Sequence, residues 1–133
     1  MRFKIMLLLF LCITVFAGCG ATTELNISTS EVSSIIIQSG TTGENFEVSD
    51  VDTIRLITDS FNSLSIKRSE KTCTTGCSYG LIWYGKDGKI LESIAYAISP
   101  NENYTVTGIK KDGYDWKITN GEVDNALIES LLP

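Results

Sequence analysis

The sequence predicts an α+β domain: a single antiparallel sheet of about five to seven strands, one helix after the first hairpin and a C-terminal helix. Three observations support this class. Short β-rich runs are separated by turn-forming residues, one internal stretch carries apolar residues at helical spacing, and a second such stretch closes the chain. Helices packed on one face of an antiparallel sheet would bury the apolar side of every predicted element.

The first two strands are predicted at 32–38 and 44–48. Three consecutive isoleucines, Ile35, Ile36 and Ile37, favour extended structure in the first run. The turn-forming residues at 39–43 separate it from the second run. We therefore expect a β-hairpin that opens the domain.

A helix is predicted over 49–64, where apolar residues recur every three or four positions. Ser49 is the expected N-cap, and acids in the first turn complement the positive end of the helix dipole. Arg55 and Asp59 are four residues apart on the outer side, where we expect them to pair. The predicted buried stripe consists of Val51, Ile54, Ile57, Phe61 and Leu64.

The rest of the chain predicts further antiparallel strands and a last helix. Asp87-Gly88 and Asp112-Gly113 are dipeptides typical of type I′ turns, so each is expected to connect a hairpin. Asn120-Gly121 ends the strand pattern before the terminal helix. The predicted elements are strands at 65–71, 79–84, 90–98, 104–109 and 114–119 and a helix at 122–132.

The Asp87-Gly88 turn also predicts which residues are paired in the hairpin around it. With both residues at the centre of the turn, cross-strand partners occupy the same face of the sheet. One face then holds the pairs Trp83–Glu92, Leu81–Ile94 and Tyr79–Tyr96, and the other holds Tyr84–Leu91, Ile82–Ser93 and Gly80–Ala95. In the second hairpin the same reasoning pairs Ile109 with Trp116, Thr107 with Ile118 and Lys110 with Asp115.

The many aromatic residues of the second half allow two interpretations. One is core and cross-strand packing. The other is a partly exposed aromatic sheet face that binds a partner or a glycan, because both faces of the first of these hairpins look apolar. The candidate binding face consists of Tyr79, Trp83, Tyr84 and Tyr96.

The N-terminus has the organisation of a secretory signal peptide. Arg2 and Lys4 precede an apolar run at 5–16, which is shorter than the roughly 20 residues of a membrane-spanning helix. We expect removal of residues 1–18. Residues 19–33, rich in Thr, Ser and Asn, are then a lipid-anchored flexible linker, and 34–133 form a single α+β domain.

The segment Phe16-Ala17-Gly18-Cys19 resembles the lipobox of bacterial lipoproteins, with Phe16 where Leu is usual. The resemblance implies a diacylglycerol on Cys19, cleavage before it and an acylated new N-terminus. With the 79–96 hairpin and the exit from strand to helix at 116–124, the chain is similar to small uncharacterised lipoproteins of Gram-positive bacteria. That family implies attachment to the extracytoplasmic side of the cell membrane and offers no active site to transfer.

The four cysteines have different expected fates. Cys12 leaves with the signal peptide and Cys19 carries the lipid, so Cys73 and Cys77 remain as an even pair in an extracytoplasmic protein. We expect a disulfide that closes a short loop between adjacent strands. A redox or metal-handling pair and two free thiols are the alternatives.

Charge and composition exclude several classes of function. The net charge of −5 becomes more negative without Arg2 and Lys4. This argues against a nucleic-acid partner and against binding to anionic lipid through a cluster of basic residues. The membrane contact is then expected through the acyl chains alone. No histidine is present, which excludes Ser-His-Asp and Cys-His catalysis and any His-containing metal site within this chain.

We therefore expect a monomeric, non-enzymatic binding module that uses no cofactor or metal. Its expected partner is another envelope protein or a cell-wall component, engaged through the sheet or an edge strand. An envelope inhibitor or immunity-type protein is the alternative, and a carboxylate-based hydrolase is the less favoured third.

Overall fold

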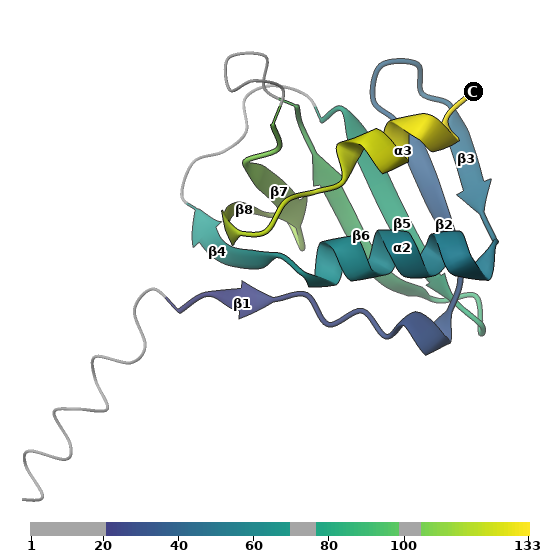
Figure 1. The fold of residues 1–133 in the computed structure, drawn as a ribbon, viewed down its shortest axis with the longest axis horizontal. Helices are drawn as coiled ribbons and strands as arrows, with labels where there is room; N and C mark the ends of the chain where they lie inside the picture. Colours follow the sequence, from purple (N-terminus) through teal and green to yellow (C-terminus); the bar gives the residue numbers. More distant parts are fainter. Residues whose placement is uncertain (1–20, 70–76, 99–104) are drawn as a thin grey trace, which may run out of the picture.

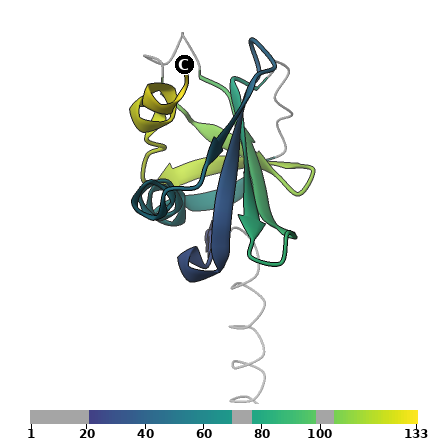
Figure 2. The same cartoon turned by 90° about the vertical axis from the view of Figure 1, so that its right-hand side faces the viewer.

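The fold is taken from a computed structural model, which describes residues 21–69, 77–98 and 105–133. Within them the chain forms one eight-stranded antiparallel sheet, in the order β1-β4-β8-β7-β6-β5-β2-β3, with two α-helices on one side of it (Figures 1 and 2). The elements are β1 (Thr23–Glu24), the 3-10 helix η1 (Thr29–Glu31), β2 (Val32–Ser39), β3 (Asn45–Val48), α2 (Val51–Asn62), β4 (Ser65–Ser69), β5 (Tyr79–Gly85), β6 (Ile90–Tyr96), β7 (Gly108–Lys111), β8 (Tyr114–Asn120) and α3 (Asn125–Leu131). The predicted α+β class and antiparallel sheet are confirmed, but the expected strand count was too low.

The additional strand, β1, lies in the stretch expected to be a flexible linker. It pairs with β4, and the residues after it pack into the core: Leu25 is 3% exposed and Ile27 is 7% exposed. The Asn62 side chain also accepts a hydrogen bond from the Ile27 N–H and donates one to its carbonyl, both at 2.9 Å. Residues 23–33 therefore belong to the folded domain. Their polar composition suggested a flexible linker, but two buried side chains and the two Asn62–Ile27 hydrogen bonds, the amide clamp, hold them in place.

Helix α2 matches the predicted helix, with two corrections at its N-terminal end. The N-cap is Asp50, not Ser49, because Asp50 is three residues before Thr53 and accepts its backbone N–H at 2.9 Å and its hydroxyl at 2.8 Å. These hydrogen bonds lower the pKa of Asp50. Arg55 pairs with Asp52 at 3.4 Å, one turn nearer the N-terminus, and not with Asp59.

The predicted buried stripe of α2 is confirmed except at its first residue. Val51 is 67% exposed, because it opens the first turn before the helix reaches the sheet. The side chains that do pack on the sheet are Ile54, Ile57, Thr58 and Phe61, with Leu64 just beyond the helix.

The β5–β6 hairpin confirms most of the predicted register. Trp83 pairs with Glu92, Leu81 with Ile94 and Tyr79 with Tyr96, and the opposite face pairs Ile82 with Ser93 and Gly80 with Ala95. A bulge next to the turn changes the last predicted pair, so that Tyr84 is opposite Ile90 instead of Leu91.

The two Asp-Gly dipeptides form different turns. Asp112 and Gly113 both have positive φ, 54° and 75°, which is the type I′ turn expected, and they confirm the Ile109–Trp116 and Lys110–Asp115 pairs. Around Asp87 only Gly88 has positive φ, and Gly85 N–H donates to the Lys89 carbonyl at 2.8 Å. The loop therefore has three residues, and the Asp87 carboxylate helps to hold it by accepting the Lys89 N–H at 3.0 Å.

Helix α3 begins later than predicted, with Asp124 as its N-cap accepting the Leu127 N–H at 3.0 Å. Gly121 turns the chain from β8 toward it at a φ of 83°, where a Cβ would be 2.9 Å from the Ser63 carbonyl oxygen. With α2, α3 covers the face of the sheet that carries Ile35, Ile37, Leu81 and Trp83 (Figure 2).

Candidate functional site

The four aromatic residues of the candidate binding face do not lie on one exposed surface. Trp83 and Tyr96 are 0% and 1% exposed beneath the helices, and Tyr79 is half-buried on the same face near its border. Tyr84 is half-buried on the opposite face. The predicted face is therefore wrong as a unit, since alternation along β5 puts Tyr84 on the other side of the sheet and the helices cover Trp83 and Tyr96.

The buried aromatic residues form the centre of the core. Phe61 of α2 meets Trp83 edge to face with the ring centroids 5.2 Å apart, and Tyr79 and Tyr96 are 5.7 Å apart. The Trp83 indole N–H donates to the Thr58 hydroxyl at 3.1 Å, which satisfies the one buried polar side chain of α2. These contacts fix α2 on the sheet and are the core packing that the first interpretation predicted.

A different surface combines exposed backbone with exposed side chains: β3, the terminal strand of the sheet beside β2 (Figure 1). Ser39 N–H donates to the Glu44 carbonyl at 2.9 Å, so these two opposed residues are a hydrogen-bonded pair. Hydrogen-bonded and non-hydrogen-bonded pairs alternate in an antiparallel ladder. The backbone N–H and C=O groups of Asn45 and Glu47 therefore point away from β2, toward the open edge.

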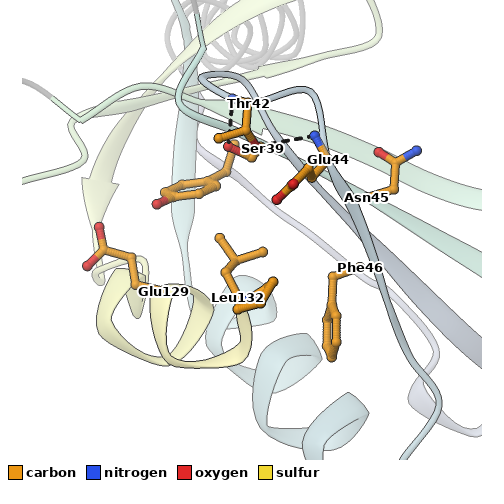
Figure 3. A pocket seen from close by; sticks show the side chains of 9 residues that line it. Ser39, Thr42, Glu44, Asn45, Phe46, Glu129 and Leu132 are labelled. Atoms are coloured by element: carbon orange, nitrogen blue, oxygen red, sulfur yellow. Dashed lines mark hydrogen bonds between the residues drawn. The ribbon is translucent and has the colours of Figure 1, made fainter.

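A groove of about 630 Å³ runs along the helix side of this edge, between β3 and the end of α3 (Figure 3). Its lining is about half apolar and half polar. The apolar part comes from Phe46, Tyr79, Leu132 and Pro133, and the polar part includes the acids Glu44 and Glu129. Phe46 is 36% exposed, whereas Ile37, its partner on β2, is fully buried. We call β3 with this groove the β3 groove.

A hydrogen bond between Tyr79 of β5 and Glu129 of α3 connects the two walls of the β3 groove. Desolvation raises the pKa of Tyr79, and the negative charge of Glu129 and its hydrogen bond with the phenol raise it further. At neutral pH the Tyr79 hydroxyl is therefore a neutral donor facing a carboxylate, so the groove offers hydrogen-bonding groups beside its apolar lining.

The sequence did not predict the β3 groove, although each of its residues is visible there. The 44–48 strand was predicted, but the sequence does not say that this strand is at the end of the sheet. Leu132 lay within the predicted terminal helix, but its position next to Phe46 depends on how α3 crosses the sheet. A short strand carrying an aromatic residue between acids, as in Glu44 to Glu47, is the signal that could have drawn attention to it.

The two cysteine predictions fall largely outside the described residues. Cys19 and Cys73 are not among them, so lipidation and the Cys73–Cys77 disulfide stay predictions. Cys77 itself is half-buried, and its backbone carbonyl is packed so closely against Gly40 that a Cβ at Gly40 would collide with it. The Gly40 N–H also donates to the Ser78 carbonyl at 2.8 Å, which ties the start of β5 to the β2–β3 turn beside the groove.

Neither a metal site nor a membrane-spanning helix is found among the described residues. No group of three or more Cys, Asp or Glu side chains within 21–69, 77–98 and 105–133 could hold a metal ion. Across those same ranges, no helix has both the length and the apolar character needed to cross a bilayer.

Comparison with known proteins identifies no relative: no family model, no curated protein and no solved structure matches this chain.

Proposed function

We propose that this protein is a lipid-anchored, extracytoplasmic binding module of the bacterial envelope that engages another envelope protein through the β3 groove. The observation that carries the proposal is the coincidence of an open strand edge with a groove of mixed apolar and polar lining at the same place. A polypeptide segment can add to such an edge by main-chain hydrogen bonds while its alternate side chains enter the groove.

The backbone of β3 supplies the main-chain part of this recognition. Asn45 and Glu47 offer two N–H donors and two C=O acceptors in the spacing of a regular antiparallel ladder. An incoming strand would continue the sheet beyond β3. Its side chain opposite Phe46 would lie on the helix side, over the groove, because opposed residues share a face.

The charges around β3 favour a different protein over a second copy of this chain. Glu44 and Glu47 are both exposed, and the groove adds Glu129. Two β3 edges meeting in antiparallel fashion would bring these carboxylates together, and like charges opposed across strands are destabilising. The same acids would attract a partner segment that carries lysine or arginine.

The proposed anchor is at the other end of the sheet. Cys19 precedes β1, which lies seven strands from β3, roughly 34 Å along the sheet since neighbouring strands are about 4.8 Å apart. A lipid on Cys19 therefore leaves the β3 groove accessible to partners (Figure 1).

Site-specific photocrosslinking in intact cells tests the binding proposal. A photoreactive amino acid replaces Phe46 in the full-length protein, and a second variant carries it at the exposed Leu56 of α2 as a matched control. We expect a discrete protein adduct at Phe46 that is absent at Leu56. The identity of the captured protein then distinguishes a structural partner from a toxin or hydrolase that the module inhibits.

The variant Asn45→Pro provides the mechanistic control. Proline removes the outward N–H of Asn45 without removing a hydrogen bond to β2. Strand addition predicts loss of the Phe46 adduct in this background. An adduct of unchanged yield, or none at Phe46 in the parent protein, would contradict the proposal.

Anchoring is tested separately. Metabolic labelling with an alkyne fatty acid should mark the protein in the membrane fraction, and Cys19→Ser should abolish the label and the mature size. Labelling that survives Cys19→Ser would refute the assignment of the lipid to that residue.

A further inference from the structure

Two lysines face each other on the side of the sheet that the helices leave open. Lys67 of β4 is the direct cross-strand partner of Lys117 of β8, and both are exposed. Their neighbours Ile66 and Ile118 point to the helix side, where Ile66 is 1% exposed and belongs to the core. Like charges directly opposed on a sheet destabilise it unless an anion lies between or over them.

The lysine pair is next to the proposed lipid attachment point. Thr23 is opposite Ile66, and continuing this register by one residue beyond β1 would bring Thr22 beside Lys67. Thr22 is three positions after Cys19. An extended chain advances at most about 3.6 Å per position, or about 11 Å in all. A lipid on Cys19 would therefore keep the backbone of Lys67 within about 16 Å of the lipid attachment point, the sum of this reach and one strand spacing of about 4.8 Å.

The other charged groups on this part of the face are few. Lys110 of β7 is opposite Asp115 of β8, and Glu24 of β1 is opposite Ser65. Asp115 lies two residues from Lys117 on this face and Glu24 lies diagonally to Lys67, but neither lysine has an acid as its direct cross-strand partner on β8 or β4. The acidic net charge of the chain does not describe this surface, because the acids of β3 and its groove are at the other end of the sheet.

We propose that Lys67 and Lys117 contact anionic lipid headgroups and so fix the orientation of the domain on the bilayer. The open face of β4 and β8 then lies against the membrane surface, and the β3 groove is directed away from it. Anionic headgroups would supply the negative charge that offsets the repulsion between the two lysines. The anchor would keep these headgroups at high local concentration near the lysines. This inference rests on the lipid anchor of the proposed function, and it revises the expectation that only acyl chains touch the bilayer.

The test uses the lipid-modified protein, purified from membranes and reconstituted in two kinds of vesicle: phosphatidylcholine alone, and phosphatidylcholine mixed with phosphatidylglycerol. Reductive methylation with formaldehyde, an uncharged reagent, reports the accessibility of each lysine by peptide mass spectrometry. Lys86 and Lys89, both exposed in the β5–β6 turn, are the internal reference.

We expect labelling of Lys67 and Lys117 relative to Lys86 and Lys89 to fall at least roughly threefold in the phosphatidylglycerol vesicles. High salt should restore it, since exposed charges are screened. An unchanged ratio would overturn the inference. So would equal protection by inorganic phosphate on phosphatidylcholine vesicles, which would indicate a site for a small anion instead of a membrane surface.

The intact mass of the same sample separates this inference from the proposal beneath it. A protein without diacylglycerol at Cys19 would refute the anchor, and the membrane orientation would fall with it. A lipidated protein whose lysine ratio is the same in both vesicles would refute only the orientation.

Discussion

The two ends of the sheet are held in opposite ways. The β1 edge, residues 23–27, has a strand of only two residues, yet Leu25 and Ile27 are buried and Asn62 binds the Ile27 backbone twice. The β3 edge has four strand residues, but Asn45, Phe46 and Glu47 are exposed and only Val48 is buried. Burial of side chains, and not the number of ladder residues, therefore determines how firmly each end of the sheet is held.

The largest loss of stability should come from removing a buried side chain next to β1. Leu25→Ala removes a buried side chain and is expected to lower the free energy of unfolding by about 2–5 kcal/mol. Urea unfolding of a lipid-free protein that lacks residues 1–18 and carries Cys19→Ser measures this. Leu56→Ala is the same chemical change at a residue that is 59% exposed, and should lie within about 1 kcal/mol of the parent. Equal values for the two variants would mean that residues 23–27 are only loosely attached.

A smaller loss should follow from removing the amide clamp. Asn62→Ala leaves the Ile27 N–H and carbonyl without their 2.9 Å partners, and is expected to lower the free energy of unfolding by about 1–3 kcal/mol. Asn45→Ala is the control at the β3 edge, where the amide side chain is exposed, and should be close to neutral. Amide exchange at Ile27 should rise in Asn62→Ala. Protection of Ile27 that persists would show that burial alone closes this edge.

Alkaline pH should lower the free energy of unfolding through Tyr96, whose hydroxyl holds α3, the helix that lines the β3 groove. Burial raises the pKa of Tyr96, with Tyr79 and Glu129 raising it further. A tyrosine with a raised folded-state pKa stabilises the fold fully below its unfolded pKa of about 10, and that contribution is lost as pH rises beyond it. Tyr96 donates to Asn125 of α3 at 2.9 Å, so α3 should be released first. Tyr96→Phe should flatten the fall in stability above pH 10, and an unchanged slope would contradict this assignment.

The smallest change in stability is expected at the β3 edge itself. Asn45→Pro should alter the free energy of unfolding by no more than about 1 kcal/mol, because the N–H it removes points away from β2. Thermal unfolding of the two proteins side by side measures it. A large loss of stability would mean that the backbone of Asn45 is already engaged within the fold, and that β3 is not an open edge.

Local pattern was enough to predict most of the elements, and one turn shows where it stops. The sequence contains the same dipeptide twice, and only Asp112-Gly113 forms the type I′ turn. At Asp87 the carboxylate caps the Lys89 N–H, and the resulting three-residue loop displaces Tyr84 by one residue relative to β6. The bulge restores the predicted register from Trp83 onward, so most of the face assignment was right although the turn type was wrong.

The candidate site could not be predicted because it depends on long-range pairing. β2 lies between β3 and β5, and β4 lies between β1 and β8, whereas the sequence indicated only pairs that are adjacent in the chain. Without that order, Phe46 is an apolar residue in a short strand and Lys67 is one of several exposed lysines. The composition of residues 21–31 was misleading for a related reason: Asn62, which binds the Ile27 backbone, is 35 residues away in the sequence.

The closeness of β1 to Cys19 has a consequence for maturation. The peptidase and acyl transferase that the proposed lipidation requires would need slack in the polypeptide around Cys19, but Thr23 is already paired with Ile66 in the sheet. Export, lipid attachment and cleavage would therefore have to be completed while this first strand is still undocked. If Cys19 is processed as proposed, insertion of Leu25 and Ile27 into the core would be the last step of biogenesis and would fix the new N-terminus to the domain.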